Sequence, residues 1–130
     1  MRDVYIIGTG IHPWMGFSEQ VFADFAAVAV DGALKDANIE WKKIQAIMAG
    51  IFIYGGNAGH LSGQYLESIF GETGVPVVNV YNACATGSAA IRMAFNSVAA
   101  GETDTALAFG ADVRSEEHTS ELQSPNTMSY

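Results

Sequence analysis

The sequence predicts an α/β fold with an open, mostly parallel sheet, helices on both faces and the element order β-α-β-α-β-α-β. Two observations predict this fold. Short apolar runs rich in β-branched residues alternate with longer stretches in which apolar residues recur at helical spacing. Glycine or polar residues separate the two kinds of stretch, and strands that alternate with helices in this way are joined by right-handed parallel crossovers.

The predicted strands are apolar runs of a length and composition typical of buried parallel strands. They are Val4–Gly10, Ile44–Ile53, Val77–Tyr81 and Thr105–Gly110. The predicted helices lie between them, at Ser18–Asn38, at Ser62–Phe70 and from Ala83 to the stop signal Gly101. Ser18 is a good N-cap, and the apolar residues after it form one face, so the first helix is expected to cover the sheet.

The composition is that of a globular and rather apolar chain. Hydrophobic residues make up 49% of the 130 residues, and the mean hydropathy is +0.17, which suffices for one domain with a core. The formal net charge is −8, and the six Lys and Arg residues do not cluster. This charge argues against binding to nucleic acid or to an acidic membrane surface.

The cysteine count and the start of the chain indicate a location. A single cysteine excludes a disulfide framework and fits a reducing compartment. No apolar run reaches the length of a membrane span, and Met1-Arg2-Asp3 leads directly into the first predicted strand instead of a signal peptide. We therefore expect a cytoplasmic protein, with the peroxisome as the alternative in a eukaryote.

The only cysteine, Cys84, lies where the third predicted strand gives way to the third predicted helix. On composition alone, a single cysteine among alanines is a small buried hydrophobe. Its position indicates a second interpretation, because a sharp strand-to-helix turn that presents a nucleophile resembles the nucleophile elbow of acyl-transfer enzymes. A thiol there faces unpaired backbone N–H groups and the positive end of the helix dipole, and both favour the nucleophilic thiolate.

Three segments of the sequence resemble segments of a known protein family. The segment NACATGSAAIRMA from Asn82, with the Gly-Glu-x-Asp turn and the strand TALAFGAD after it, resembles the acylatable cysteine segment of the thiolase family. The stretch GHLSGQYLESIFGETGVPVVNVYNACATG from Gly59 and the opening VYIIGTGIHPW from Val4 are similar to the same family. The likeness is strongest to the acetyl-CoA acetyltransferase branch related to sterol-carrier and lipid-transfer proteins. It runs continuously from Met1 to about Val113 and implies a thiolase-like N-terminal half.

The resemblance also implies an acyltransferase reaction. Cys84 would attack the thioester of an acyl-CoA as the acyl-accepting nucleophile, with its own backbone N–H as an oxyanion donor. Thr86 and Gly87 are small and are the implied substrate-binding positions. Coenzyme A thioesters are then the substrates, no cofactor or metal is expected, and the reaction is Claisen condensation or thiolytic cleavage of a 3-ketoacyl-CoA. The intact parent is implied to be a homodimer or a homotetramer.

The catalytic bases are the missing part of this interpretation. Family members supply them from Gly-His-Pro and Cys-Gly-Gly-type segments of a later half, and neither segment is present in this sequence. We therefore expect that this chain alone does not complete turnover.

His12 precedes a proline in an aromatic loop and is interpreted as a turn or packing residue. His60 ends a glycine-rich loop that lacks the Gly-Lys-Ser/Thr ending of a phosphate site, so it is interpreted as orienting that loop or capping a helix.

Two alternatives stay open. The chain could be a fragment of a ketoacyl-synthase-III-type condensing enzyme, which shares the elbow but uses an acyl-carrier protein. It could also be a non-catalytic thiolase-like protein that binds acyl-CoA, with its cysteine merely packed. The Cys-Ala-Thr-Gly motif and the long Gly59–Gly74 segment favour a thiolase over a synthase.

The end of the sequence differs from the rest. From Arg114 the composition changes to the polar string RSEEHTSELQSPNTMSY. Arg114–Ser124 resembles a sequencing-library adapter translated in frame, which predicts a partial thiolase-like domain at residues 1–113 and a non-native or disordered tail at residues 114–130. The acidic and histidine side chains of this tail are not interpreted as metal ligands; they are Glu116, Glu117, His118 and Glu121.

Overall fold

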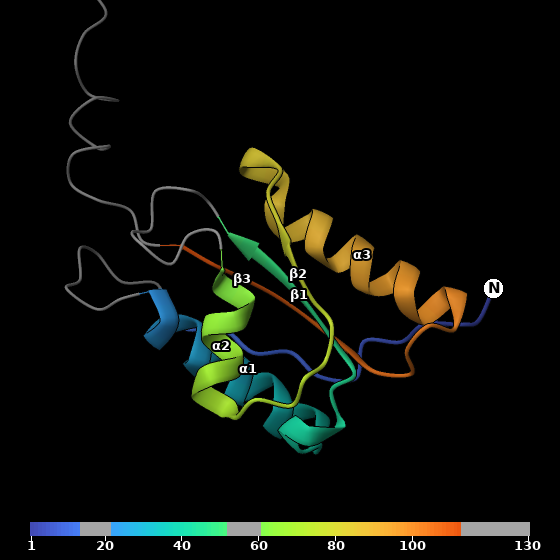
Figure 1. The fold of residues 1–130 in the computed structure, drawn as a ribbon, viewed down its shortest axis with the longest axis horizontal. Helices are drawn as coiled ribbons and strands as arrows, with labels where there is room; N and C mark the ends of the chain where they lie inside the picture. The colour runs from blue at the N-terminus through green and yellow to red at the C-terminus, as the bar shows by residue number, and fades with distance from the viewer. Residues whose placement is uncertain (14–21, 52–60, 113–130) are drawn as a thin grey trace, which may run out of the picture.

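The computed structural model describes residues 1–13, 22–51 and 61–112 (Figure 1). The sheet strands are β1 (Ala46–Ile51), β2 (Val77–Val80) and β3 (Ala106–Ala111). They are parallel and lie in the order β2-β1-β3. The helices are α1 (Phe22–Ala37), α2 (Ser62–Phe70) and α3 (Thr86–Ala100), with 3-10 helices η1 (Trp41–Lys43) and η2 (Ala83–Ala85). Helices α1 and α2 cover one face of the sheet and α3 covers the other (Figure 1), as predicted for an α/β fold.

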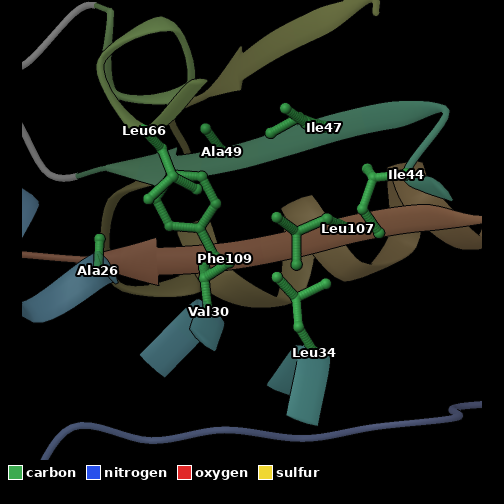
Figure 2. Packing of buried hydrophobic residues seen from close by; sticks show 9 residues of the cluster. All are labelled: Ala26, Val30, Leu34, Ile44, Ile47, Ala49, Leu66, Leu107 and Phe109. Atoms are coloured by element: carbon green, nitrogen blue, oxygen red, sulfur yellow. The ribbon is translucent and has the colours of Figure 1, made fainter. Parts of the chain in front are cut away.

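Strand β1 is buried on both faces, which explains why its sequence is apolar without alternation. Ile47 and Ala49 face α1 and α2, whereas Ala46 and Met48 face α3 and pack with Ala90. The larger cluster consists of Ala26, Val30, Leu34, Ile44, Ile47, Ala49, Leu66, Leu107 and Phe109 (Figure 2). Full burial of one such aliphatic or aromatic side chain contributes roughly 1.5–3 kcal/mol, so this cluster holds the two helices to the sheet.

The prediction of a buried strand at Val4–Gly10 is wrong, because residues 1–13 form no strand in the structure. The segment packs on helices instead of pairing with a strand. A Cβ atom on Gly10 would lie 2.0 Å from the carbonyl oxygen of Ala29, so only glycine allows this approach to α1. The Thr9 N–H donates to Asp36 Oδ2 at 2.8 Å, and the Arg2 N–H donates to the carbonyl oxygen of Ala99 in α3 at 3.1 Å. These amides are therefore bound to helices.

The other predicted elements are confirmed within a few residues. Helix α2 has the predicted bounds, and α1 ends one residue before Asn38, which adopts a left-handed φ of 53°. Asparagine tolerates this conformation better than most residues, so it ends the helix without glycine. The predicted start of the first helix at residues 18–21 lies outside the described residues, as do residues 52 and 53 of the second predicted strand.

Candidate functional site

The turn that joins β2 to α3 lies at the carboxyl ends of the parallel strands (Figure 1). Cys84 is the middle residue of η2, which forms this turn. Strand β2 ends at Val80, η2 carries the cysteine, and α3 begins at Thr86. The cysteine is exposed and is not enclosed by the apolar core. In open α/β sheets, ligands bind at the carboxyl ends of the strands. The position predicted from sequence is therefore the position that the structure gives to this side chain.

The turn contains a backbone conformation that is uncommon for a side-chain-bearing residue. Ala83 has a φ of 46°, in the left-handed region, which costs a non-glycine residue roughly 1–2 kcal/mol. Two backbone hydrogen bonds close the turn: Ala85 N–H donates to Asn82 O at 2.9 Å, and Thr86 N–H donates to Ala83 O. Neither bond uses the N–H of Cys84.

The side chain of Thr86 bonds to the same turn. Its hydroxyl oxygen accepts the N–H of Asn82 at 2.8 Å and donates to the carbonyl oxygen of Ala83 at 2.7 Å. Thr86 is only 6% exposed, whereas Gly87 beside it is exposed. The substrate-binding role of these two residues stays a prediction, but the single hydroxyl proton of Thr86 already has an acceptor within the turn.

Two strand glycines let the first turn of α3 approach the sheet. Gly50 of β1 and Gly110 of β3 are partners in the parallel register. A Cβ atom on Gly50 would lie 3.1 Å from Cγ2 and 3.3 Å from the carbonyl oxygen of Thr86, and one on Gly110 would lie 3.9 Å from Cα of Gly87. Sequence reasoning missed this pair, although a glycine inside a strand signals the close approach of another backbone.

Asn79, in the middle of β2, ties this strand to the start of α2. Its Oδ1 accepts the Gly63 N–H at 2.9 Å and the Ser62 hydroxyl at 3.2 Å, while its Nδ2 donates to Gln64 Oε1 at 2.7 Å. The amide oxygen therefore caps a helix that has no side-chain cap of its own. These hydrogen bonds fix β2, the strand that leads to Cys84, against the N-terminus of α2. The signal in the sequence was a polar residue within an apolar strand.

The remaining sequence candidates lie elsewhere. The ring of His12 packs edge-on against Phe25, with ring centroids 4.7 Å apart, and its Nδ1 lies 2.7 Å from the carbonyl oxygen of Pro13, so His12 is a packing residue as interpreted. His60 and the four tail residues lie outside the described residues. Among residues 1–13, 22–51 and 61–112, no group of His, Cys, Asp and Glu side chains is arranged to hold a metal ion. None of the helices in this part of the chain is long and apolar enough to cross a membrane.

A shallow depression of about 540 Å³ lies at the opposite end of the sheet. Apolar and charged side chains from the ends of α1 and α2 and from η1 line it, including Leu34, Lys35, Trp41 and Phe70. Trp41 stacks on Phe70 at 4.9 Å and donates its indole N–H to the carbonyl oxygen of Gly71 at 2.8 Å. This aromatic pair therefore packs at the amino ends of the strands, whereas the cysteine turn lies at their carboxyl ends.

A parallel sheet with an exposed cysteine at a strand-to-helix turn is the architecture of proteins that hold a nucleophile at an elbow. The family described as the thiolase N-terminal domain matches residues 4–129, and this chain belongs to the thiolase family. The resemblance and the fold class predicted from the sequence are thereby confirmed. The match includes the tail, so the predicted domain boundary at residue 113 stays a prediction.

Curated relatives include proteins with the names of the predicted branch. Sterol carrier protein 2 of Bos taurus is 34% identical over 110 residues, which are 82% of this chain and 20% of that protein. The acetyl-CoA acetyltransferase of Methanothermobacter thermautotrophicus is 32% identical over 117 residues, 86% of this chain and 30% of that protein. A benzoylsuccinyl-CoA thiolase subunit of Thauera aromatica is 33% identical over 112 residues, 85% of this chain and 28% of that protein. The chain thus spans about a fifth to a third of the length of these relatives.

Solved structures share the fold. The acetyl-CoA acetyltransferase of Syntrophomonas wolfei superimposes with a TM-score of 0.65 at 21% identity, covering 75% of this chain and 26% of that chain. Xanthomonas campestris OleA bound with cerulenin gives 0.64 at 23% identity, covering 88% and 34%. The 3-oxoacyl-[acyl-carrier-protein] synthase III of Aquifex aeolicus gives 0.59 at 18% identity, covering 65% and 27%. Thiolases and synthases of the third type therefore share this arrangement of strands and helices.

Proposed function

We propose that this chain is the acyl-accepting part of a thiolase-type acyltransferase, with Cys84 as the nucleophile. The observation that carries the proposal is an exposed cysteine at the turn between β2 and α3 of a thiolase N-terminal domain. Two relatives are named as an acetyl-CoA acetyltransferase and a benzoylsuccinyl-CoA thiolase subunit, which supports coenzyme A thioesters as substrates. The proposal includes no further cofactor.

The proposed chemistry is transfer of an acyl group between two sulfur atoms. The Cys84 sulfur forms a bond to the carbonyl carbon of the acyl-CoA, the bond from that carbon to the coenzyme A sulfur breaks, and the Cys84 thiol proton ends on coenzyme A. Negative charge develops on the carbonyl oxygen during this step. The N–H of Cys84, which neither hydrogen bond of η2 uses, is the proposed donor to that oxygen.

The intact protein would use the S-acyl group in a second step. A carbon–carbon bond forms from the α-carbon of a second acyl-CoA, the bond to Cys84 breaks, and the α-proton ends on the cysteine sulfur. The product is a 3-ketoacyl-CoA, and the reverse reaction is thiolytic cleavage. Removing the α-proton needs a base. Because the base-bearing segments of the family are absent from this sequence, we expect this chain to accept an acyl group without completing turnover.

The proposal for the intact protein includes assembly as a homodimer or homotetramer. Strand β2 lies at one edge of the three-stranded sheet. Leu61, the N-cap of the adjoining helix α2, and Tyr65 and Ile69 within that helix recur at four-residue spacing and are each about half exposed. An edge strand beside an apolar stripe supports a contact with another protein surface. The cytoplasm, or the peroxisome in a eukaryote, stays the proposed location.

The second candidate function is acyl-CoA or lipid binding without chemistry at Cys84. The names of the sterol carrier protein 2 relatives favour it. The synthase alternative has the weaker support, because the synthase neighbour shares the fold at 18% identity while the family match is to thiolases.

The test is acylation of the purified full chain by acetyl-CoA, followed by intact and peptide mass spectrometry. We expect one acetyl group on the peptide that contains Cys84, removable by hydroxylamine, with one equivalent of coenzyme A released. Cys84→Ala is the control and should accept none. An equal acetyl content in Cys84→Ala would refute the proposal.

A chain that binds acetyl-CoA, and whose Cys84 reacts with iodoacetamide but not with acetyl-CoA, would instead support the binding function. Binding is measured by isothermal titration calorimetry with the non-hydrolysable thioether analogue of acetyl-CoA. This arm separates the two candidates, because only acyl transfer needs the sulfur of Cys84.

A further inference from the structure

We infer that Thr86 is a positioning residue for Cys84: its buried hydroxyl holds the backbone before the cysteine in the conformation that acyl transfer needs. The inference rests on the proposed function and gives Thr86 a role other than contact with substrate. It comes from the two hydrogen bonds of this hydroxyl, its burial and the packing of its methyl group.

The hydroxyl binds both residues that precede the cysteine. Its oxygen accepts the N–H of Asn82 at 2.8 Å, and its proton goes to the carbonyl oxygen of Ala83 at 2.7 Å. The side chain therefore links the residues before Cys84 to the first residue of α3. A hydroxyl has one proton, so donation to a substrate would require breaking the bond to Ala83. The structure thus favours a role within the turn.

The two hydrogen bonds are made to the strained residue of the turn and to its neighbour. Ala83 is left-handed, with a φ of 46°, and Asn82 directly precedes it. A strained residue of this kind persists only where its surroundings fix it. Without the hydroxyl, the Asn82 N–H loses its partner and Ala83 can relax toward an ordinary conformation. Because the next residue is Cys84, such a relaxation reorients its sulfur and its N–H together.

The methyl group of Thr86 provides a second and independent anchor. Its Cγ2 lies 3.1 Å from where a Cβ atom of Gly50 would be, so the methyl group occupies the space left free by that glycine on β1. The two γ-substituents thus have different roles: the hydroxyl fixes the turn, and the methyl group packs α3 against the sheet. Valine keeps both γ-positions without the hydroxyl, whereas serine keeps the hydroxyl without the methyl group.

This division predicts a selective chemical defect. Acyl transfer needs the cysteine sulfur and a hydrogen-bond donor aligned on one carbonyl group, while alkylation by iodoacetamide needs only the sulfur. Loss of one such donor in an enzyme lowers rates by about 100-fold or more, so partial misalignment should lower them by about tenfold. We therefore expect Thr86→Val to acylate about tenfold more slowly than the unchanged chain, with alkylation within about twofold. Thr86→Ser should stay within about threefold in both reactions.

The experiment uses the full chain and the variants Thr86→Val and Thr86→Ser. Acetylation of Cys84 by acetyl-CoA and its alkylation by iodoacetamide are measured side by side, with the melting temperature as the control for folding. Nuclear magnetic resonance then reads the turn directly. The amide hydrogen of Asn82 should exchange slowly, and the coupling constant of Ala83 should report its left-handed φ, in the unchanged chain and in Thr86→Ser but not in Thr86→Val.

Each outcome decides the inference. Equal acetylation of Thr86→Val and the unchanged chain, with Asn82 still protected, would overturn it. A parallel fall of acetylation and alkylation in Thr86→Val would also overturn it, because the hydroxyl would then support only access or folding. If the unchanged chain is not acetylated at all, the proposed function fails. The exchange rate of Asn82 in the unchanged chain still decides whether the hydroxyl holds the turn, and it does so even if Thr86→Val fails to fold.

Discussion

The two turns at the ends of β2 both contain residues with a left-handed φ, but different side chains stabilise them. Before the strand, Gly71 and Gly74 have φ values of 112° and 72°. The carboxylate of Glu67 holds that turn, accepting the N–H of Thr73 and of Gly74 at 2.9 Å each. After the strand, an alanine takes the left-handed position, and a buried neutral hydroxyl holds the turn.

The difference separates a turn that only reverses the chain from one that presents a side chain. Within the described part of the chain, nothing lies within 4 Å of where a Cβ atom on Gly71 or Gly74 would be, so backbone conformation calls for glycine there. At Ala83 the chain accepts a left-handed residue with a side chain directly before Cys84. Strain of this kind gathers at functional sites and is held by the surrounding structure.

The largest effect is expected in the strand between the two turns, at Asn79, which ties β2 to the start of α2. Replacement by leucine leaves the Gly63 N–H without its acceptor and the Ser62 hydroxyl, 1% exposed, without a partner. Unsatisfied buried groups cost about 1–3 kcal/mol each, so we expect Asn79→Leu to lower the free energy of unfolding by about 3 kcal/mol. Urea titration measures it.

Asn79→Asp is the matched control. Its carboxylate still accepts both bonds and lies at the N-terminus of α2, where negative charge is favourable. Only the bond to Gln64 is lost, and that side chain is exposed. We expect a loss within about 1 kcal/mol. If leucine and aspartate proved equally destabilising, the capping role of the amide oxygen would be wrong.

A smaller effect tests which turn stores strain. Gly74→Ala puts a Cβ atom on a left-handed residue and should cost about 1 kcal/mol, after allowance for the stiffer unfolded chain. Ala83→Gly relieves the same kind of strain while making the unfolded chain more flexible, so the two terms oppose and the change should stay within about 0.5 kcal/mol. Thermal melts of both variants measure this. Equal losses in the two variants would contradict left-handed strain at Ala83.

The elements predicted from the sequence are those with a strong local signal. The sequence predicts helix α2 with its observed bounds, because the turn that begins at Gly71 ends it. The cysteine turn was predicted because the apolar run of β2 stops at a polar residue, Asn82, directly before helical spacing begins. Hydrophobic periodicity and the turn residues that end it predict elements of this kind without knowledge of the tertiary structure.

The prediction of the first strand is wrong because an apolar run does not indicate which part of the protein the segment will contact, a strand or a helix. Tyr5 and Ile6 are exposed in the structure, while the backbone at Gly8 and Gly10 lies on α1. The same limit applies to the site: the bonds from Thr86 depend on the side chain's rotamer and on φ of Ala83, and neither is encoded in residue spacing. The pairing of Gly50 with Gly110 depends in the same way on the register of β1 and β3, which the sequence does not give.

The apolar nature of α3 has a clearer outcome. The sequence of α3 is apolar nearly all round, and in the structure one side of the helix packs on the sheet through Ala90 and Thr86. Ile91 and Phe95, one turn apart on the other side, are 58% and 43% exposed. Sterol carrier protein 2 of Bos taurus and the acetyl-CoA acetyltransferase of Methanothermobacter thermautotrophicus are three to five times longer than the segment they share with this chain, so additional chain is available in those proteins to cover such a face.

The smallest effect, and the one that most directly separates the two turns, is a pH dependence confined to Glu67. Burial acts to raise the pKa of Glu67, but hydrogen bonds from the N–H groups of Thr73, Gly74 and Val75 and from the Thr73 hydroxyl outweigh it, so the pKa is lowered. The folded state therefore binds a proton less readily than the unfolded chain. The stabilisation is present above the ordinary glutamate pKa of about 4.3 and is lost as the pH falls through the lowered value.

We therefore expect Glu67→Gln to be less stable than the unchanged chain at pH 7 and the two to converge as the pH falls below about 4. Urea titrations from pH 7 to pH 3 measure the gap between them, which cancels the titration of all other carboxylates. The turn at Ala83 is held by a hydroxyl that does not titrate in this range, so the protection factor of the Asn82 amide should stay constant while the fold persists. A gap that widens toward low pH would reverse the sign worked out here and would remove the electrostatic distinction between the turns.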